Sequence, residues 1–413
     1  MIKVLHFADT HIDMASYGKR DPESGLPFRV LDFLTALDTI IDTAINEKVD
    51  LVLFAGDAYK DRTPVPTYQR EWGKRIMRLS EAGIPTLLLV GNHDLSPTQG
   101  RAHALQEFRT LQVPHVRVVD RPVFFSAGDF ENLPLQIMAL PWVSRSVFVA
   151  SEQDNDQKSV NIAQSMEEKL ISLIDHWLER LDPQVPALFL AHASVQGAIY
   201  GNERTVMLGG DFVLPAGLLK DNRLDYVALG HIHKAQNLNE NAHPPIIYPG
   251  SIERVDFGEI KDDKYFVTAH IDKGHTELDW RKLDGRKFLD CEITLNQDEE
   301  INSQILQCLP DAANARQAII RVRIHYPKHL ESMIDEPFIR DQLSEAFAVH
   351  LIRRPELELR TRLAVDTAME SLSPMALLNL YWDTKQLKGD RDMLIQLAAT
   401  VMAKELGQEK EIL

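Results

Sequence analysis

Five short motifs bring together residue types that bind divalent metal ions. They are Asp9-x-His11, Gly56-Asp57, Gly91-Asn92-His93-Asp94, an isolated His192, and Gly230-His231-Ile232-His233. Carboxylate oxygens, an amide oxygen and imidazole nitrogens are ligands that Mn²⁺, Fe²⁺ and Zn²⁺ accept. Each motif by itself says little, because an Asp-x-His pair, a Gly-Asp turn or a lone histidine is common in proteins that bind no metal.

The residue types suggest a role for several of these positions. Asp57 has two carboxylate oxygens and could therefore bridge two cations. Asn92 offers a neutral carbonyl oxygen, and His93 beside it could deliver or stabilise a proton. We expect Asp94 to orient His93, as carboxylates commonly do for imidazoles near metals. The alternative for Gly91-Asn92-His93-Asp94 is an ordinary hydrogen-bonded turn.

Each motif follows a predicted β-strand. Short apolar runs end at the motifs, and they cover residues 2–7, 51–54, 86–90, 187–191 and 226–229. Helical periodicity predicts helices over 28–48, 67–82 and 159–181. This alternation predicts an α/β domain. Because ligands gather at the carboxyl ends of strands in α/β sheets, we expect the five motifs to converge.

The pattern changes after about residue 281. Predicted strands over 288–295, 318–325 and 351–360 alternate with predicted helices over 301–309 and 337–347, which indicates a small α+β module. Ser373-Pro374 then begins a helix, and a second helix carries an apolar stripe of Leu394, Leu397, Ala398, Val401 and Met402. We therefore expect three parts: 1–280, 281–363 and 364–413.

The composition excludes some classes of protein. A net charge of −16 over 413 residues argues against a simple electrostatic nucleic-acid binder, although an enzyme could still reach nucleic acid through metals or local basic patches. Cys291 and Cys308 have no metal-type spacing and predict no disulfide framework. The start of the chain lacks the apolar region of a signal peptide, and no run is long enough to span a membrane. We expect a cytoplasmic protein.

The order of the five motifs resembles the calcineurin-like metallophosphoesterase superfamily. The resemblance implies a four-layer α-β-β-α sandwich and a two-metal hydrolysis of phosphoesters. It assigns Asp9, His11, Asp57 and His233 to one divalent ion, and Asp57, Asn92, His192 and His231 to the other. It implies two Mn²⁺ ions, with His93, supported by Asp94, as the catalytic residue.

Further segments resemble the SbcD family of DNA double-strand-break repair nucleases: residues 2–11, Tyr248-Pro249-Gly250-Ser251, Arg254 and Phe257-Gly258-Glu259. This resemblance implies a nuclease domain over 1–280, a DNA-capping domain over 281–363, and a helix pair over 364–413 that docks on an SbcC-type coiled-coil ATPase. It also implies a homodimer of nuclease subunits within a heterotetramer. The implied activities are a 3′-to-5′ exonuclease on duplex DNA and an endonuclease on single strands and hairpins.

One departure and two alternatives remain. Many relatives outside bacteria carry a second catalytic histidine shortly after the bridging Asp, but the run from Gly56 to Arg62 contains none. Lys60 and Arg62 are then either solvated charges or phosphate contacts. Six arginines are either backbone contacts or an ordinary solvated face: Arg321, Arg323, Arg353, Arg354, Arg360 and Arg362. The competing functions are a small-molecule phosphatase or cyclic-nucleotide phosphodiesterase, and a non-catalytic DNA-tethering scaffold.

Overall fold

The computed structural model describes residues 1–17, 19–95, 101–143, 159–201, 213–296, 300–356, 373–385 and 391–408. The chain divides into two compact units. The first comprises Met1–Asp290, Pro310–Arg321 and Gln342–His350, and the second comprises Cys291–Leu309, Val322–Asp341 and Leu351–Leu413. The division into 1–280, 281–363 and 364–413 stays a prediction.

The first unit contains two six-stranded sheets. One sheet has the order β14-β13-β1-β2-β3-β4, formed by His275–Leu283, Lys264–Asp272, Ile2–Phe7, Leu51–Phe54, Thr86–Leu89 and Val116–Val119. The other has the order β11-β12-β10-β7-β6-β5, formed by Gln236–Asn237, Ile246–Tyr248, Tyr226–Gly230, Ala187–His192, Gln136–Leu140 and Val123–Phe125. Strands β1 to β4 run parallel to one another, as do β6, β7, β10 and β12. Strands β13, β14, β5 and β11 pair in antiparallel orientation at the sheet edges.

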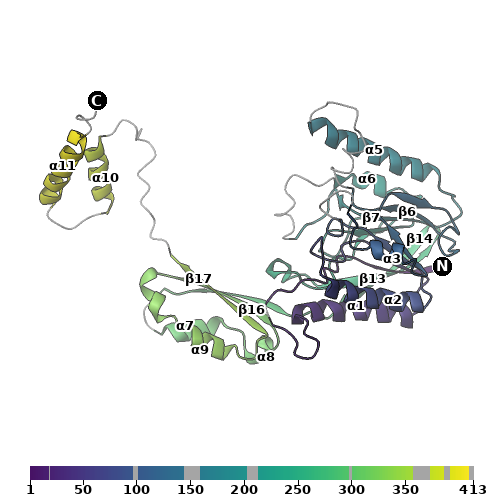
Figure 1. The fold of residues 1–413 in the computed structure, drawn as a ribbon, viewed down its shortest axis with the longest axis horizontal. Helices are drawn as coiled ribbons and strands as arrows, with labels where there is room; N and C mark the ends of the chain where they lie inside the picture. The colour runs from purple at the N-terminus through teal and green to yellow at the C-terminus, as the bar shows by residue number, and fades with distance from the viewer. Residues whose placement is uncertain are drawn as a thin grey trace. The chain divides into compact units, whose positions relative to one another are not determined.

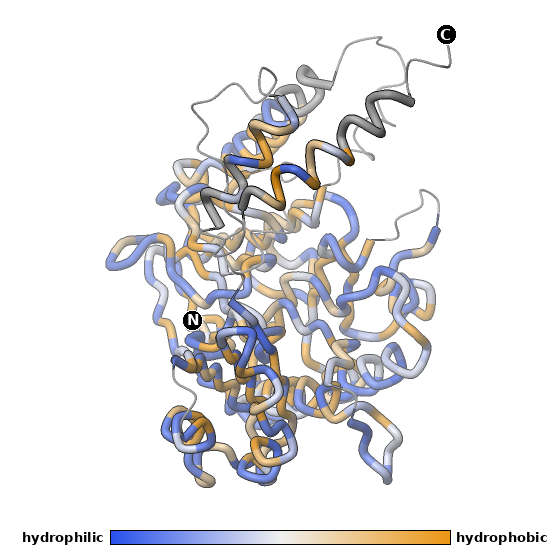
Figure 2. Tube along the Cα trace, turned by 90° about the vertical axis from the view of Figure 1, so that its left-hand side faces the viewer, coloured by the Kyte–Doolittle hydropathy of each residue, from blue (hydrophilic) through white to orange (hydrophobic). Residues whose placement is uncertain are grey.

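The two faces of each sheet bury different sets of side chains. On β2, Leu51 and Leu53 pack between the sheets, while Val52 and Phe54 pack beneath the helices. On β7, Leu188 packs between the sheets and Phe189 packs toward α5. Strands buried on both faces read as continuous apolar runs, which is how the sequence presents them. Figure 2 shows the resulting interleaving of hydrophobic and hydrophilic residues along the chain.

Helices cover the outer faces of the sheets. Helices α1 (Phe28–Asn46) and α2 (Pro66–Glu81) share one core with the first sheet, and α5 (Ser159–Glu179) shares another with the second sheet. In Figure 1 α1 and α2 lie on one side of the strands and α5 on the other. Short helices α3 (Gln106–Thr110) and α6 (Ala216–Leu219) complete the unit. The predicted four-layer α-β-β-α sandwich is confirmed.

The β13–β14 hairpin was not predicted from the sequence. Its strands pair in antiparallel register from Lys264–Leu283 to Asp272–His275 around a two-residue turn, in which Gly274 has φ +77°. Strand β13 also pairs with β1, so the hairpin extends the sheet that positions Asp9. The predicted boundary after residue 280 falls within β14.

Beyond residue 287 the chain forms a three-stranded sheet in the order β15-β16-β17, from Phe288–Thr294, Ile319–Tyr326 and Ala348–Pro355. The accompanying helices are α7 (Ile301–Cys308), α8 (Ala312–Ala315) and α9 (Glu336–Gln342). Two further helices, α10 (Pro374–Lys385) and α11 (Arg391–Gln408), match the predicted helix pair. No helix among the described residues is long and apolar enough to cross a membrane.

Candidate metal centre

The motif residues stand where parallel strands end. Asp9, Asp57 and Asn92 follow β1, β2 and β3 of one sheet, whereas His192 ends β7 and His231 follows β10 of the other. Hydrogen bonds join the two sheets at these ends. The backbone N–H of His231 donates to Asp9 Oδ2 at 3.0 Å, and His192 Nε2 lies 2.9 Å from Asn92 Oδ1. The predicted convergence at the carboxyl edge is therefore present.

One group of potential ligands consists of Asp9, His11 and His233, whose ligand atoms lie within 4.8 Å of one another. All three residues are buried. The Nε2 atoms of His11 and His233 face each other at 3.0 Å. Two imidazole nitrogens and a carboxylate directed at one point form the kind of donor set that holds a divalent ion.

A second group consists of Asp57, His192 and His231, which meet the same 4.8 Å criterion and are buried. Asn92 Oδ1 lies 2.9 Å from His192 Nε2 and also 2.9 Å from His231 Nδ1. The two groups divide these side chains as the expected assignments do, except that Asp57 falls in the second group alone, and the assignment of each residue to an ion stays a prediction. The role of Asp57 as a bridge between two ions stays a prediction as well.

The charge of the second group, Asp57, His192 and His231, favours the binding of a cation. Burial alone would raise the pKa of Asp57, but His192 and other nearby histidines hold it well below its ordinary value. Burial alone would lower the pKa of His192, but Asp57 raises it to about 9. In the metal-free protein the proton on His192 therefore supplies the positive charge that the buried carboxylate needs. A bound metal ion would supply that charge instead.

The turns that carry these ligands have unusual backbone geometry. Asp9, His11, Asp57 and His231 have φ values of 51°, 37°, 63° and 100°. A left-handed conformation at a non-glycine residue costs about 1–3 kcal/mol, and such residues cluster at functional sites. Gly91 leaves room for this packing, because a Cβ there would collide with the carboxylate of Asp57.

The structure corrects the prediction for Asp94. Its buried carboxylate does not contact His93 but accepts three backbone N–H groups at 2.9 Å each, from Asp57, Ala58 and Gly91. The correct interpretation is that Asp94 fixes the turns that present Asp57 and Asn92. Burial raises its pKa to about 7, even though two of these N–H donors act in the opposite direction.

His93 is held by backbone contacts instead. Its ring Nδ1 lies 2.8 Å from the carbonyl oxygen of Lys60, and because a carbonyl can only accept, Nδ1 donates. Its backbone N–H donates to Asp57 Oδ1 at 2.8 Å, and its ring centroid lies 5.3 Å from that of His11. His93 also lines a cavity of about 730 Å³. It is thus placed beside both ligand groups and open to a substrate.

Sequence analysis missed two residues of the site. Glu259 Oε1 lies 2.8 Å from His233 Nδ1, and its other oxygen accepts from Lys264 Nζ at 2.6 Å. Trp142, two residues after β6, packs its ring 4.8 Å from that of His231. The sequence carries a signal for each residue. Glu259 belongs to the Phe257-Gly258-Glu259 segment that resembles the SbcD family, although the resemblance assigns no role to this glutamate. Trp142 follows the end of a strand, as the motif residues do.

Replacing Asp94 by Asn should destabilise the protein. An amide has one acceptor oxygen and one donor nitrogen, so at least one of the three N–H groups loses its partner inside the core. We expect a loss of about 1–3 kcal/mol in the free energy of unfolding. Chemical denaturation of the metal-free protein measures it. Asp129→Asn is the control, because that exposed carboxylate accepts a backbone N–H only from Ser126; equal effects of the two variants would refute the role given to Asp94.

Replacing Glu259 by Gln should weaken metal binding. Glu259 fixes the ring of His233 so that Nε2 faces His11, and losing such a partner costs about 10- to 100-fold in metal affinity. Calorimetric titration with Mn²⁺ measures this. Glu259→Gln/Lys264→Met removes both buried charges and should bind Mn²⁺ equally weakly. Glu253→Gln, at a buried glutamate near Arg29 instead, should retain normal affinity; Mn²⁺ binding of wild-type strength by both Glu259 variants would contradict the prediction.

Comparison with known proteins agrees with the geometry. Residues 2–235 match the calcineurin-like phosphoesterase family. The chain is 24% identical to SbcD, a subunit of the SbcCD nuclease of Escherichia coli K12, over 294 residues, covering 67% of this chain and 66% of that protein. It is 25% identical to the metallophosphoesterase YhaO of Bacillus subtilis over 282 residues, covering 67% of this chain and 59% of YhaO.

A longer match is to the DNA double-strand break repair protein Mre11 of Saccharolobus solfataricus, 22% identical over 415 residues, with 100% of this chain and 89% of that protein covered. The chain spans just under two thirds of the bacterial SbcD and less of YhaO. Together with the motif order and the two ligand groups, the family match over more than half of the chain establishes that this protein belongs to the calcineurin-like phosphoesterase family.

Proposed function

We propose that this protein is the nuclease subunit of an SbcCD-type complex, which hydrolyses DNA phosphodiesters with two divalent metal ions, most naturally Mn²⁺. The observation that carries the chemistry is the convergence of Asp9, His11 and His233 with Asp57, His192 and His231 at one edge of the sandwich. All seven expected ligand positions, Asn92 included, lie in or beside these groups. A complete set of this kind supports a working enzyme over a non-catalytic scaffold.

The proposed chemistry divides between ions and protein. Two bound ions would activate a water molecule and stabilise charge on the attacking and leaving oxygens. Within the protein, Asp94 and Glu259 hold the ligands in place. His93, the one general-acid candidate, would stabilise the transition state or protonate the leaving oxygen from its place beside His11.

Support for DNA as the substrate comes from the relatives, SbcD and Mre11. The strand arginines support it less than the sequence suggested. Arg321 pairs with Asp290, Arg323 pairs with Glu292, and Arg353 pairs with Glu336. These pairs favour a solvated face, and Arg360 and Arg362 lie outside the described residues. The proposal of a DNA-capping domain over 281–363 therefore rests on the resemblance.

The proposed partner is an SbcC-type coiled-coil ATPase, bound by the helix pair over 364–413 in a heterotetramer with two nuclease subunits. On α11, Leu397 and Val401 are 61% and 55% exposed, and Met393 and Leu394 are exposed as well. The side chain of Met402 lies outside the described part. Exposed apolar residues grouped on one short helix are typical of a docking surface.

Replacing His93 by Ala should abolish most DNA cleavage while metal binding persists, because His93 touches the site without being a predicted ligand. We expect a loss of about 10²- to 10⁴-fold in the rate with Mn²⁺. Linear duplex, hairpin and single-stranded DNA are compared with a phosphomonoester. Unchanged DNA cleavage by His93→Ala would remove the catalytic assignment, and turnover of the monoester without any DNA cleavage would show a small-molecule phosphatase.

Placing charge on α11 should uncouple the protein from its partner. In the full chain, Leu397→Asp/Val401→Asp should prevent co-elution with a co-expressed SbcC-type ATPase in size-exclusion chromatography, because a charged residue cannot be buried unpaired in an apolar interface. Hydrolysis of bis(p-nitrophenyl) phosphate should stay normal. Ala399→Asp, at another exposed position of the same helix, is the control. Co-elution of the double variant as strong as that of the control would refute the docking role.

A further inference from the structure

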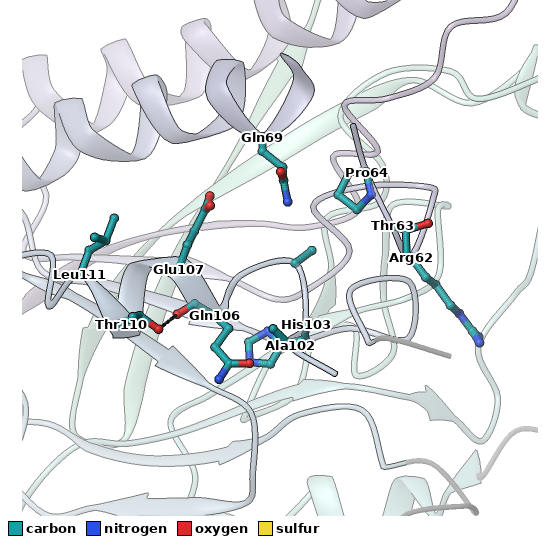
Figure 3. Close-up of a pocket in the computed structure, with 11 residues that line it drawn as sticks. Arg62, Thr63, Pro64, Gln69, Ala102, His103, Gln106, Glu107, Thr110 and Leu111 are labelled. Atoms are coloured by element: carbon teal, nitrogen blue, oxygen red, sulfur yellow. Dashed lines mark hydrogen bonds between the residues drawn. The ribbon is translucent and has the colours of Figure 1, made fainter. Parts of the chain in front are cut away.

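Two cavities lie along the loop that follows Asp57. The first, of about 730 Å³, is lined by His93, by Lys60 to Thr63, and by residues 13–16. The second, of about 590 Å³, is lined by Arg62 to Pro64, by Gln69 of α2, and by residues of α3 and of the chain just before and after it (Figure 3). Arg62 and Thr63 line both cavities. A substrate that reaches His93 therefore has the second cavity next to it, beyond these two residues.

The loop between the cavities is fixed in place. The carboxylate of Asp13 accepts the backbone N–H groups of Lys60 and Asp61, the latter at 2.7 Å, and His93 donates to the Lys60 carbonyl at 2.8 Å. The side chains of Lys60 and Arg62 form no hydrogen bond or ion pair with any residue that the structure describes. Two cations with no ion-pair partner among the described residues therefore lie beside the proposed phosphodiester site.

Arg62 and Glu107 border the second cavity from different sides, and the guanidinium of Arg62 extends away from the other residues that line it. In Figure 3 Arg62 lies on one side, and Glu107 and Leu111 lie on the other. The amides of Gln69 and Gln106 add hydrogen-bond donors and acceptors, and Leu111 belongs to the apolar part of the wall. An anion would be attracted to the Arg62 side and repelled from the Glu107 side. A group with amino or imino hydrogens would bind Glu107.

His103, a largely enclosed histidine that lines this cavity, lies against the carboxylate of Asp120. The side chain of His103 is 9% exposed, and neither ring nitrogen hydrogen-bonds to any described residue. Its Nε2 lies 3.4 Å from an Asp120 carboxylate oxygen. Burial lowers the pKa of His103, while the neighbouring Asp120 carboxylate acts in the opposite direction.

We propose that the second cavity binds the base of the nucleotide that flanks the phosphodiester being cleaved, with the phosphate of that nucleotide on the Arg62 side. The inference rests on the proposed function, DNA cleavage. A nucleotide matches the cavity because its phosphate is anionic and its base presents donors and acceptors at the far end. Glutamine and glutamate are side chains that recognise base edges. Extrusion of a base from a stack costs a few kcal/mol, and less in a single strand.

The test either removes the base from the DNA substrate or fills the second cavity by a substitution in the protein. A single-stranded oligonucleotide and the same strand with one abasic nucleotide are digested with Mn²⁺, and the cleavage positions are mapped at single-nucleotide resolution. The wild type should cut the bond beside the abasic nucleotide about tenfold less, the effect of losing one base contact. Ala102→Phe fills the cavity and should cut both strands equally. Gln106→Ala should reduce the wild-type difference.

Two controls isolate the base from the rest of the site. Ala82→Phe places the same ring on an exposed alanine at the end of α2, which lines neither cavity, and should keep the tenfold preference. All variants should hydrolyse bis(p-nitrophenyl) phosphate at the wild-type rate. Equal cleavage of intact and abasic strands by the wild type, or an undiminished preference in Ala102→Phe, would overturn the base cavity and leave the nuclease standing. Hydrolysis of the small diester without DNA cleavage would overturn the proposed function itself, and the cavity assignment with it.

Discussion

The contact on which the centre depends most is the buried carboxylate of Asp94 with its three backbone N–H donors. Those donors belong to two different turns, one after β2 and one after β3. A single carboxyl group therefore joins the turn of Asp57 to the turn of Asn92. Because hydrogen bonds inside a low-dielectric core are strong and directional, the spacing between these two ligands is set before any ion binds.

Other hydrogen bonds fix the remaining ligand residues in a similar way. The backbone N–H groups of Asp9 and Thr10 donate to the carbonyls of Gly56 and Asp57, so the first turn is tied to the second. His192 Nδ1 lies 2.6 Å from the Ala55 carbonyl, and His233 is tied to Glu259. Each of these two rings is thus held through the nitrogen that does not face the candidate ion. Preorganisation of this kind offsets the strained φ angles, because the surrounding bonds leave the turns little alternative.

The features of the fold that the sequence predicted are those that depend on interactions between residues close together in the chain. Apolar runs, helical periodicity and glycine turns are local, and they predicted β1, β2, β3, β7, β10 and the helices α1, α2 and α5 to within a few residues. The convergence of the motifs followed from a rule about strand ends. The β13–β14 hairpin was missed, although its alternating pattern and Lys273-Gly274 turn were present.

The partners of the site residues were harder to predict. Asp94 lies next to His93 in the chain, and adjacency suggested a contact that the fold does not make. Its actual partners include Asp57 and Ala58, on another strand end, and the partner of His233 is Glu259 from a later segment. Contacts between distant segments depend on packing, so residue type and spacing alone could nominate a ligand but not identify the group that orients it.

An acidic chain that acts on a polyanion needs its positive charge concentrated at the point of reaction. Here three of the four arginines on β16 and β17 pair with Asp290, Glu292 and Glu336, and Arg75 and Arg78 on α2 pair with Asp38. What remains near His93 is Lys60, Arg62 and the proposed ions. Such a surface holds nucleic acid weakly away from the centre, since non-specific binding scales with the phosphates that cations neutralise. Binding of DNA in a cleavable position would then depend on contacts with the scissile phosphate and its nearest nucleotide, and the proposed partner would provide the remaining contacts with DNA.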